Sequence, residues 1–177
     1  NVINLSNESF KVVDNKEEQE EKEALKELDT KLSSKITQIK KLDPEFRLTQ
    51  FTNAVASAFE MIIHAFANFD HKTLKELTTK EVYDKFIGEI STIEKDGDDL
   101  QINVVAMPKN VVQDIKIQGS KIYITMDIIS EQISFIKDKK GKIINGSQKD
   151  IQEVEDIWTF SRNVKSASPV WFLSKIG

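Results

Sequence analysis

A phenylalanine-rich stretch, residues 43–70, limits what this chain can fold into more than any other segment. It contains half of the ten phenylalanines of the chain. Its large apolar residues recur at steps of three or four, which places them along one face of a helix. Asp43 can cap that helix and Pro44 suits its first turn, so we expect one long core helix. Its apolar face is formed by Phe51, Val55, Phe59, Ile62, Phe66 and Phe69.

The apolar period changes after Asp96 and Gly97, where a helical repeat gives way to alternation. Alternating segments predict strands, and Pro108 is expected to end the first of them. Because helices come first and strands follow with short links, the pattern predicts an α+β fold: N-terminal helices packed on a curved antiparallel sheet of about four to five strands. The strand segments are residues 100–106, 111–117, 121–135, 152–163 and 171–176.

Curvature is expected from a change of phase inside the segment 121–135. Its apolar residues occupy even positions up to Ile128 and odd positions at Ile133 and Phe135. A bulge beyond Ile129 would keep one face buried and would bend the sheet.

The N-terminal part has a different character. Residues 1–15 lack sustained periodicity and are expected to form a loose arm, whereas residues 16–42 predict one charged amphipathic helix. Two interpretations stay open: a helix that docks on a membrane or partner, or a solvated helix laid on its own domain. The residues that would face a membrane are Lys31, Lys35, Ile36, Ile39, Lys40 and Lys41.

The composition argues against several classes of function. A net charge of −4 and a pI of about 5.4 do not indicate a nucleic-acid-binding surface. There is no cysteine for thiolate chemistry, and two histidines give little material for a metal site, so we expect no metal and no cofactor. No apolar run reaches the roughly 18 to 20 residues needed to cross a bilayer. A membrane segment would therefore have to precede Asn1.

Three segments resemble the Tim44-like domain family. They are AFEMIIHAFANFDHKTL (residues 58–74), EVYDKF (81–86) and DIWTFSRNVKSASPVWFL (156–173), in this order. The resemblance covers about residues 43–177, which we take as the domain. Three positions depart from the family pattern. Phe69 stands where the family usually has glycine, and Ser168 and Val170 replace the usual Asp and Asn around Pro169.

The resemblance implies a fold similar to the nuclear-transport-factor-two-like (cystatin-like) group, with an apolar pocket between helices and sheet. It also implies a noncatalytic scaffold role in protein transport and peripheral binding to the inner membrane, where anionic cardiolipin is the usual lipid. A membrane or chaperone protein is the other class of partner. The expected location is the inner membrane, peripherally or through a tether outside these residues, on a side that the sequence does not give. Tethering of an import motor is not implied, because the chaperone-recruiting region has no counterpart here.

A pocket of this kind would be lined mainly by aromatic and aliphatic side chains, although the same side chains also suit a filled core. Polar anchors are expected at His64, Asp156 and Arg162, and Asp156 and Arg162 are too far apart on one strand to pair with each other. Each of these two can make a structural hydrogen bond or anchor a ligand. The predicted pocket residues are Phe59, Ile63, Phe66, Phe86, Met126, Trp158, Phe160 and Trp171.

Two polar pairs have alternative interpretations. Glu60 and His64 lie four apart on the core helix, which suits a surface pair, a polar spot in the pocket or, least of all, two metal ligands. Tyr123 and Asp127 share a strand face, which suits acid–base chemistry, but that face lies opposite the apolar one and favours solvent.

The sequence is compatible with three functions. The first is a noncatalytic, membrane-associated interaction domain that binds lipid or a protein through an apolar surface or pocket. The second is a small-molecule isomerase or dehydratase with Asp156 or His64 as its base, which requires a polar pocket centre and a carboxylate of raised pKa. The third is a protein-docking module that binds no lipid.

Overall fold

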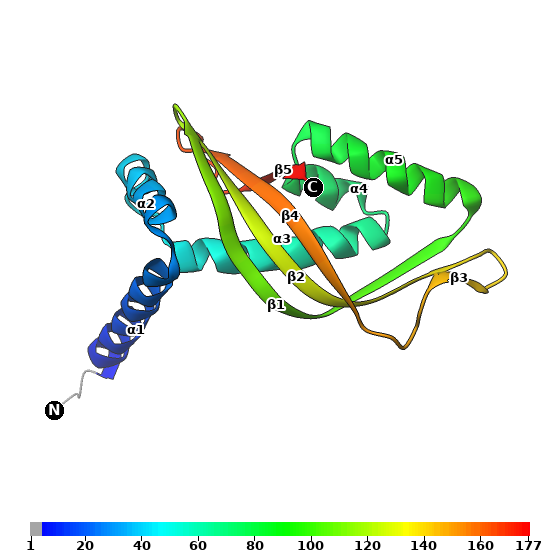
Figure 1. Ribbon diagram of the computed structural model, residues 1–177, viewed down its shortest axis with the longest axis horizontal. Coiled ribbons are helices and arrows are strands. Elements are labelled where there is room, and N and C mark those ends of the chain that lie inside the picture. Colours follow the sequence, from blue (N-terminus) through cyan, green and yellow to red (C-terminus); the bar gives the residue numbers. More distant parts are fainter. Residues whose placement is uncertain (1–4) are drawn as a thin grey trace. The chain divides into compact units, whose positions relative to one another are not determined.

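The computed structural model describes residues 5–177 of the chain, with side chains from residue 15 onward, and it divides into two compact units. One unit ends at Asn53 and the other runs from Ala54 to Gly177. The boundary falls inside a continuous helix, α3 (Leu48–Ala67). Figure 1 shows the order of the elements along the chain.

The first unit contains α1 (Leu5–Glu27), α2 (Thr30–Leu42) and the start of α3. The structure therefore differs from two expectations. Residues 5–15 are helical rather than a loose arm, and residues 1–4 lie outside the described residues. Residues 16–42 form parts of two helices, because the carboxylate of Asp29 accepts the Leu32 N–H at 2.8 Å and caps a new helix.

The start of α3 also differs from the expected position at Asp43 and Pro44. Asp43 ends α2 instead, and its N–H donates to the Ile39 carbonyl at 2.8 Å. The free N–H groups at the first turn of α3 are satisfied by Glu21 of α1: its carboxylate accepts the Leu48 N–H at 2.8 Å and the Thr49 N–H at 2.9 Å. A cap that comes from 27 residues earlier in the chain leaves no local sequence signal.

In the second unit, α3 continues and is followed by α4 (His71–Leu77) and α5 (Lys80–Asp96). Asp70 caps α4 by accepting the Thr73 N–H at 3.1 Å. The α3 helix ends in a Schellman turn, in which Phe69 has a left-handed φ of 55° and the Asp70 N–H donates to the Ala65 carbonyl at 2.8 Å. Gly97, which also has a left-handed φ, of 69°, ends α5.

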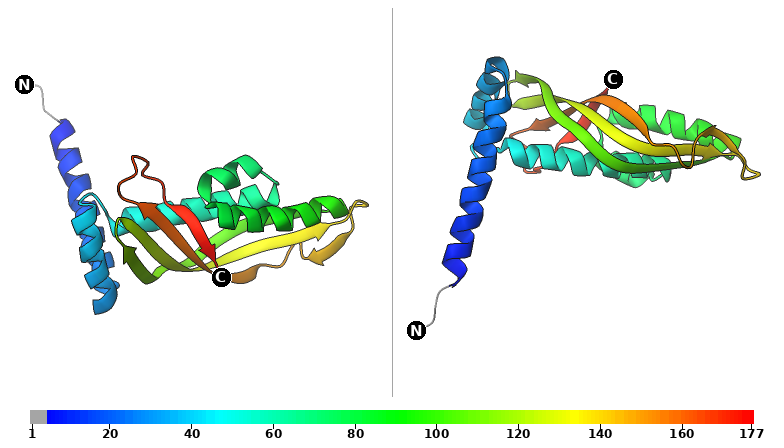
Figure 2. Two further views of the ribbon diagram at one scale, coloured as in Figure 1. Left: turned by 90° about the horizontal axis from the view of Figure 1, so that it is seen from above. Right: turned by 60° about the horizontal axis from the view of Figure 1, so that its bottom comes forward.

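The sheet has five strands, and all of its pairings are antiparallel. The strand order is β1-β2-β4-β5, with β3 attached to the end of β2. Helices first and an antiparallel sheet after them confirm the predicted α+β fold, and Figures 1 and 2 show α3, α4 and α5 on one side of the sheet. The strands are β1 (Asp99–Gln118), β2 (Lys121–Lys137), β3 (Ile143–Gly146), β4 (Gln152–Asn163) and β5 (Phe172–Ile176).

Two details of the predicted strands are wrong. Pro108 does not end the first strand, because β1 is an edge strand and Pro108 falls at the register shift between Ala106 and Lys109, where proline is tolerated. The expected bulge in β2 is absent from its pairing with β4, which stays in register from Lys121 to Gln132. The bulges lie in β1, where three register shifts against β2 each insert an extra residue.

The side of β2 that faces the helices is buried at its polar residues as well as at its apolar ones. Ile122, Ile124, Met126 and Ile128 have no exposed surface, and Ser130 and Gln132 continue the same face. Burial of these two polar side chains is tolerated because the Gln132 amide donates to the Ser130 hydroxyl at 2.8 Å. The core of this unit therefore lies between this face and the helices.

Candidate functional site

The second unit contains an open cleft with a volume of about 490 Å³ between α3, α5 and the sheet, which we call the apolar cleft. Residues from α3 and α5 form one wall, where the rings of Phe66 and Phe86 lie 5.6 Å apart. The floor is Trp158 of β4, which packs against the ring of Phe59 at 4.8 Å. The lining residues are Ile62, Ile63, Phe66, Phe86, Glu89, Ile102, Glu155, Asp156, Ile157, Trp158, Ile176 and Gly177.

The sequence pattern explains why these side chains converge. Ile62, Ile63 and Phe66 follow one side of α3, and Phe86 and Glu89 are three apart on α5, so each set shares a helix face. On β4, Asp156 and Trp158 point to the same face because side chains alternate along a strand. The cleft is thus built from elements whose positions depend on tertiary packing.

Half of the eight predicted pocket residues line the apolar cleft: Ile63, Phe66, Phe86 and Trp158. The others lie elsewhere. Phe59, Met126 and Phe160 are buried behind the cleft as core residues, and Trp171 is half-buried outside its lining.

Asp156 is the polar group that distinguishes the cleft. Its side chain is half-buried, and burial raises the pKa of its carboxyl above the ordinary value. Among the described residues no hydrogen bond or ion pair to this carboxylate is found. Opposite it on β2 lies the fully buried Ile128, which has nothing to donate. The group is therefore available to a ligand.

Arg162 and His64 do not join Asp156. Arg162 lines a separate pocket of about 530 Å³ between the start of α5 and the β4–β5 connection, and its Nε donates to the Ser168 carbonyl at 3.4 Å. We call this the Arg162 pocket; Lys80 and Lys121 also line it. His64 is exposed on α3 and is not part of the cleft lining.

The two polar pairs, Glu60 with His64 and Tyr123 with Asp127, lie outside the lining of the apolar cleft. Glu60 and His64 are both exposed on α3, and the residues whose side chains are described, 15–177, contain no group of three or more potential metal ligands. Asp127 is on the opposite sheet face from the cleft, where its carboxylate binds the Lys109 ammonium at 2.6 Å. Tyr123 lines the Arg162 pocket rather than the apolar cleft.

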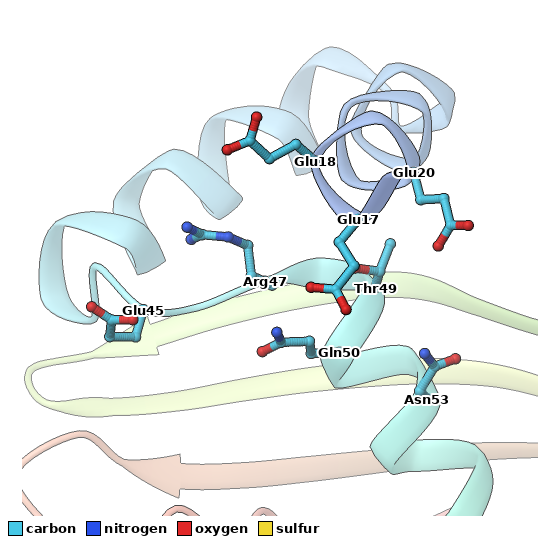
Figure 3. A pocket seen from close by; sticks show the side chains of 8 residues that line it. All are labelled: Glu17, Glu18, Glu20, Glu45, Arg47, Thr49, Gln50 and Asn53. Atoms are coloured by element: carbon cyan, nitrogen blue, oxygen red, sulfur yellow. The ribbon is translucent and has the colours of Figure 1, made fainter. Parts of the chain in front are cut away.

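The N-terminal unit has a polar pocket of its own, with a volume of about 450 Å³ (Figure 3). Arg47 is the one basic side chain among the residues drawn, and Glu17, Glu18 and Glu45 lie around it. Its Nη1 donates to the carbonyls of Pro44 and Phe46 at 3.3 and 3.0 Å. The excess of carboxylates makes this pocket unfavourable for an anionic headgroup. The lining residues are Glu17, Glu18, Glu20, Glu45, Arg47, Thr49, Gln50 and Asn53.

The predicted membrane-facing residues lie on α2. Ile36 and Ile39 are buried, at 2% and 0% exposure. Lys31 and Lys41 are exposed, while Lys35 and Lys40 are half-buried, and Lys40 is 3.8 Å from Glu21. Among the described residues, no helix is long and apolar enough to cross a membrane.

Comparison with known proteins agrees with this architecture. Residues 32–177, from α2 to the end of the sheet, match the Tim44-like domain. The chain is 23% identical over 158 residues to mitochondrial import inner membrane translocase subunit TIM44-1 of Arabidopsis thaliana, a match that covers 86% of this chain and 33% of that protein. It is 30% identical over 141 residues to the uncharacterized protein RP434 of Rickettsia prowazekii (strain Madrid E), covering 80% of this chain and 57% of that protein.

The chain thus spans about a third of the plant protein and somewhat over half of the rickettsial one. The matched region contains the whole of the second unit, including the apolar cleft and the Arg162 pocket. With helices packed on an antiparallel sheet and a family match over most of its length, this chain belongs to the Tim44-like domain family.

Proposed function

We propose that this chain is a noncatalytic interaction domain that associates with the inner membrane and binds a lipid chain or an apolar segment of a protein in the apolar cleft. The observation that carries the proposal is the cleft itself. Its volume of about 490 Å³ lies within the roughly 300 to 1,000 Å³ of ordinary ligand sites. Its walls carry half-buried apolar side chains, Ile63 and Phe66, which gain burial when an apolar group enters.

Membrane association is supported by the relationship to an inner membrane translocase subunit and by the lysines of α2. Lys31 and Lys41 are exposed there, and each basic side chain near an anionic membrane contributes about 1 kcal/mol of binding. The Arg162 pocket offers further positive charge through Lys121, whereas Lys80, which also lines it, pairs with Asp84 at 2.7 Å. We therefore assign anionic headgroups of the membrane, cardiolipin included, to these basic groups, and the binding of an apolar chain or segment to the cleft as a separate event.

Vesicle flotation tests the membrane part of the proposal. Phosphatidylcholine vesicles with cardiolipin should recruit the chain, and vesicles without cardiolipin should recruit less of it. The difference should shrink in high salt, because salt screens exposed charges. If neither kind of vesicle recruits the chain, lipid binding is excluded and protein docking remains. A pull-down with a purified candidate partner, compared between wild type and a cleft variant, then tests that docking.

The cleft is tested by a matched pair of substitutions on α3. Ile63→Glu puts a carboxylate into the lining, whereas Met61→Glu puts the same group on the same helix at a residue that is 51% exposed and outside the lining. In a Trp171→Phe background, brominated acyl chains should quench the fluorescence of Trp158. Ile63→Glu should weaken this quenching about tenfold, the equivalent of roughly 1.4 kcal/mol, and Met61→Glu should leave it unchanged. Equal effects of the two variants would exclude the cleft.

A small-molecule isomerase or dehydratase is a second candidate, because Asp156 has a raised pKa and lines a cleft. His64, the other expected base, lies outside the cleft lining. The polar groups that accompany Asp156 are the carboxylates Glu89 and Glu155. This arrangement favours binding over proton transfer at a substrate, since an acid–base mechanism also needs a group to stabilise the developing charge. Turnover of a carbonyl or hydroxy substrate that is abolished by Asp156→Asn would favour the enzyme.

A further inference from the structure

The charged groups of the apolar cleft all have the same sign. Asp156 and Glu155 come from β4 and Glu89 from α5, and no lysine, arginine or histidine is found among the described residues that line the cleft. Asp156 is half-buried, while Glu89 and Glu155 are exposed at the rim. A ligand that enters the cleft therefore meets an apolar surface first and negative charge beside it.

Asp156 differs from Glu21 and Asp127, two carboxylates that are also buried or partly buried. Glu21, 6% exposed, accepts three hydrogen bonds and lies near Lys40. Asp127 binds the ammonium of Lys109 at 2.6 Å. Asp156 has no comparable partner among the described residues, although a carboxylate removed from water is unfavourable without one. A positively charged partner from outside the chain would supply what Glu21 and Asp127 obtain within it.

The side chains next to Asp156 indicate which kind of positively charged partner fits the cleft. Trp158 lies two residues from Asp156 on the same strand face, and Phe66 and Phe86 line the same cleft. Aromatic faces beside a carboxylate attract ammonium groups through the ring quadrupole as well as through charge. An anionic headgroup here would instead face three carboxylates and be repelled.

We propose that the apolar cleft selects a ligand with an apolar body and a cationic ammonium end, and that Asp156 binds the ammonium. This inference rests on the proposed function, because it specifies the ligand of the same cleft. The chain would then bind two classes of ligand at different places. Anionic headgroups would bind the basic groups of α2 and of the Arg162 pocket, and amphiphiles with an ammonium group would bind in the apolar cleft.

Three probes that share a twelve-carbon chain and differ only at the end test the proposal: dodecylammonium, dodecanol and dodecanoate. They are titrated into the full chain at neutral pH, below micelle formation, and binding is followed by Trp158 fluorescence in the Trp171→Phe background and by calorimetry. Dodecylammonium should bind about tenfold or more tightly than dodecanol, because hydrogen bonds to a charged group contribute about 1.5 to 3 kcal/mol. Dodecanoate should bind most weakly.

The role of Asp156 is tested with two charge-neutralising substitutions on the same strand. Asp156→Asn should reduce the preference for dodecylammonium over dodecanol to less than about threefold. Glu153→Gln removes one negative charge at an exposed residue outside the cleft lining and should keep the wild-type preference. A preference that survives Asp156→Asn would overturn the assignment of the ammonium to Asp156.

Calorimetry on the wild-type chain keeps this inference separate from the proposed function and needs no variant to fold. If dodecanol or dodecanoate binds as tightly as dodecylammonium, the selection for an ammonium is wrong and the apolar cleft remains a binding site. If none of the three binds, the proposed use of the cleft fails as a whole.

Discussion

Glu21 and Asp156 are carboxylates of one chain in two opposite situations. Burial alone would raise the pKa of Glu21, but the Thr49 and Leu48 N–H groups, the Thr49 hydroxyl and the Lys40 ammonium outweigh it and lower that pKa. At Asp156 burial acts without compensation, and the pKa is raised. Glu21 therefore stabilises its surroundings in the charged form, whereas the folded state holds Asp156 in the charged form at a cost in stability.

The lowered pKa of Glu21 predicts an acid-sensitive contribution to stability. Glu21→Gln should destabilise the N-terminal unit by about 1 to 3 kcal/mol at pH 7, because hydrogen bonds to a charged acceptor are lost at the start of α3. The wild-type advantage is present above the unfolded-state pKa of about 4.3 and is lost as the pH falls through the lower folded-state value. Urea unfolding followed by circular dichroism at pH 7 and pH 3 measures both. Glu18→Gln, at an exposed neighbour, should change neither.

The raised pKa of Asp156 predicts the opposite pH dependence. Its folded form binds a proton more tightly than the unfolded chain does, so the wild type loses stability as the pH rises from the unfolded value of about 3.9 through the folded one. Asp156→Asn should therefore be more stable than wild type at pH 7, by less than about 1 kcal/mol because solvent screens this partly exposed carboxyl, and equal to it well below pH 4. A variant that is less stable at neutral pH would show that the carboxylate has a stabilising partner.

At the scale of elements, the end of α3 is formed with an unfavourable residue. Phe69 adopts a φ of 55°, which glycine reaches without strain and a phenylalanine does not. The turn still forms, because the Schellman bonds from Phe69 and Asp70 to the last carbonyls of α3 are made and Asp70 caps the next helix. The helix boundary was thus predictable from Asp70, and the strain at Phe69 was indicated by the glycine that the family usually has.

A comparison of two substitutions at Phe69 isolates this strain. Phe69→Gly and Phe69→Ala both remove the ring, but only glycine relieves the left-handed backbone, so the glycine variant should be about 1 kcal/mol more stable than the alanine variant. At the adjacent Asn68, whose φ is not positive, the order should reverse. Chemical denaturation of the four variants measures both differences, and the same order at both positions would contradict the explanation.

On the scale of the whole molecule, the two compact units offer separate spectroscopic reporters. Trp158 and Trp171 both belong to the second unit, whereas helical circular dichroism arises from both units. This division lets the stability of each part be followed in the intact chain.

Phe59→Ala and Glu21→Gln should therefore affect different probes. Phe59 has no exposed surface and packs on Trp158, so its truncation should destabilise the second unit by about 3 to 5 kcal/mol and move the tryptophan-fluorescence transition. Glu21→Gln should move the circular dichroism transition and leave the fluorescence transition in place. If both variants move both probes equally, the chain unfolds as one cooperative unit.

The periodic parts of this fold could be predicted from the sequence, and the parts set by distant contacts could not. Repeats of three to four and of two gave the core helix and the strands, since they record which side of an element is buried. The cap on α3 comes from Glu21, and the extra residues fall in β1 rather than β2, because an edge strand has one neighbour to accommodate instead of two. Neither the cap on α3 nor the bulges in β1 could be predicted from a local sequence pattern.

The same dependence on distant contacts explains why only part of the candidate site could be predicted from the sequence. Ile63, Phe66, Phe86 and Trp158 were expected in a pocket because the family resemblance implies one and their apolar side chains suit its lining. Ile102 and Ile176 were not expected, because they come from strands far apart in the sequence and line the same cleft only once the sheet has formed. The solvent-open volume that separates a cleft from a filled core depends on how the elements pack, which residue patterns do not record.

The irregular β1 also bears on how copies of this protein behave at high concentration. A straight strand at the border of a sheet offers a row of backbone groups on which another molecule can polymerise into fibrils. In β1 that row is interrupted by three extra residues and by Pro108, and the opposite border, β5, is only five residues long. Pro108→Val would restore a missing donor, so this one change should shorten the lag time of aggregation in a thioflavin assay.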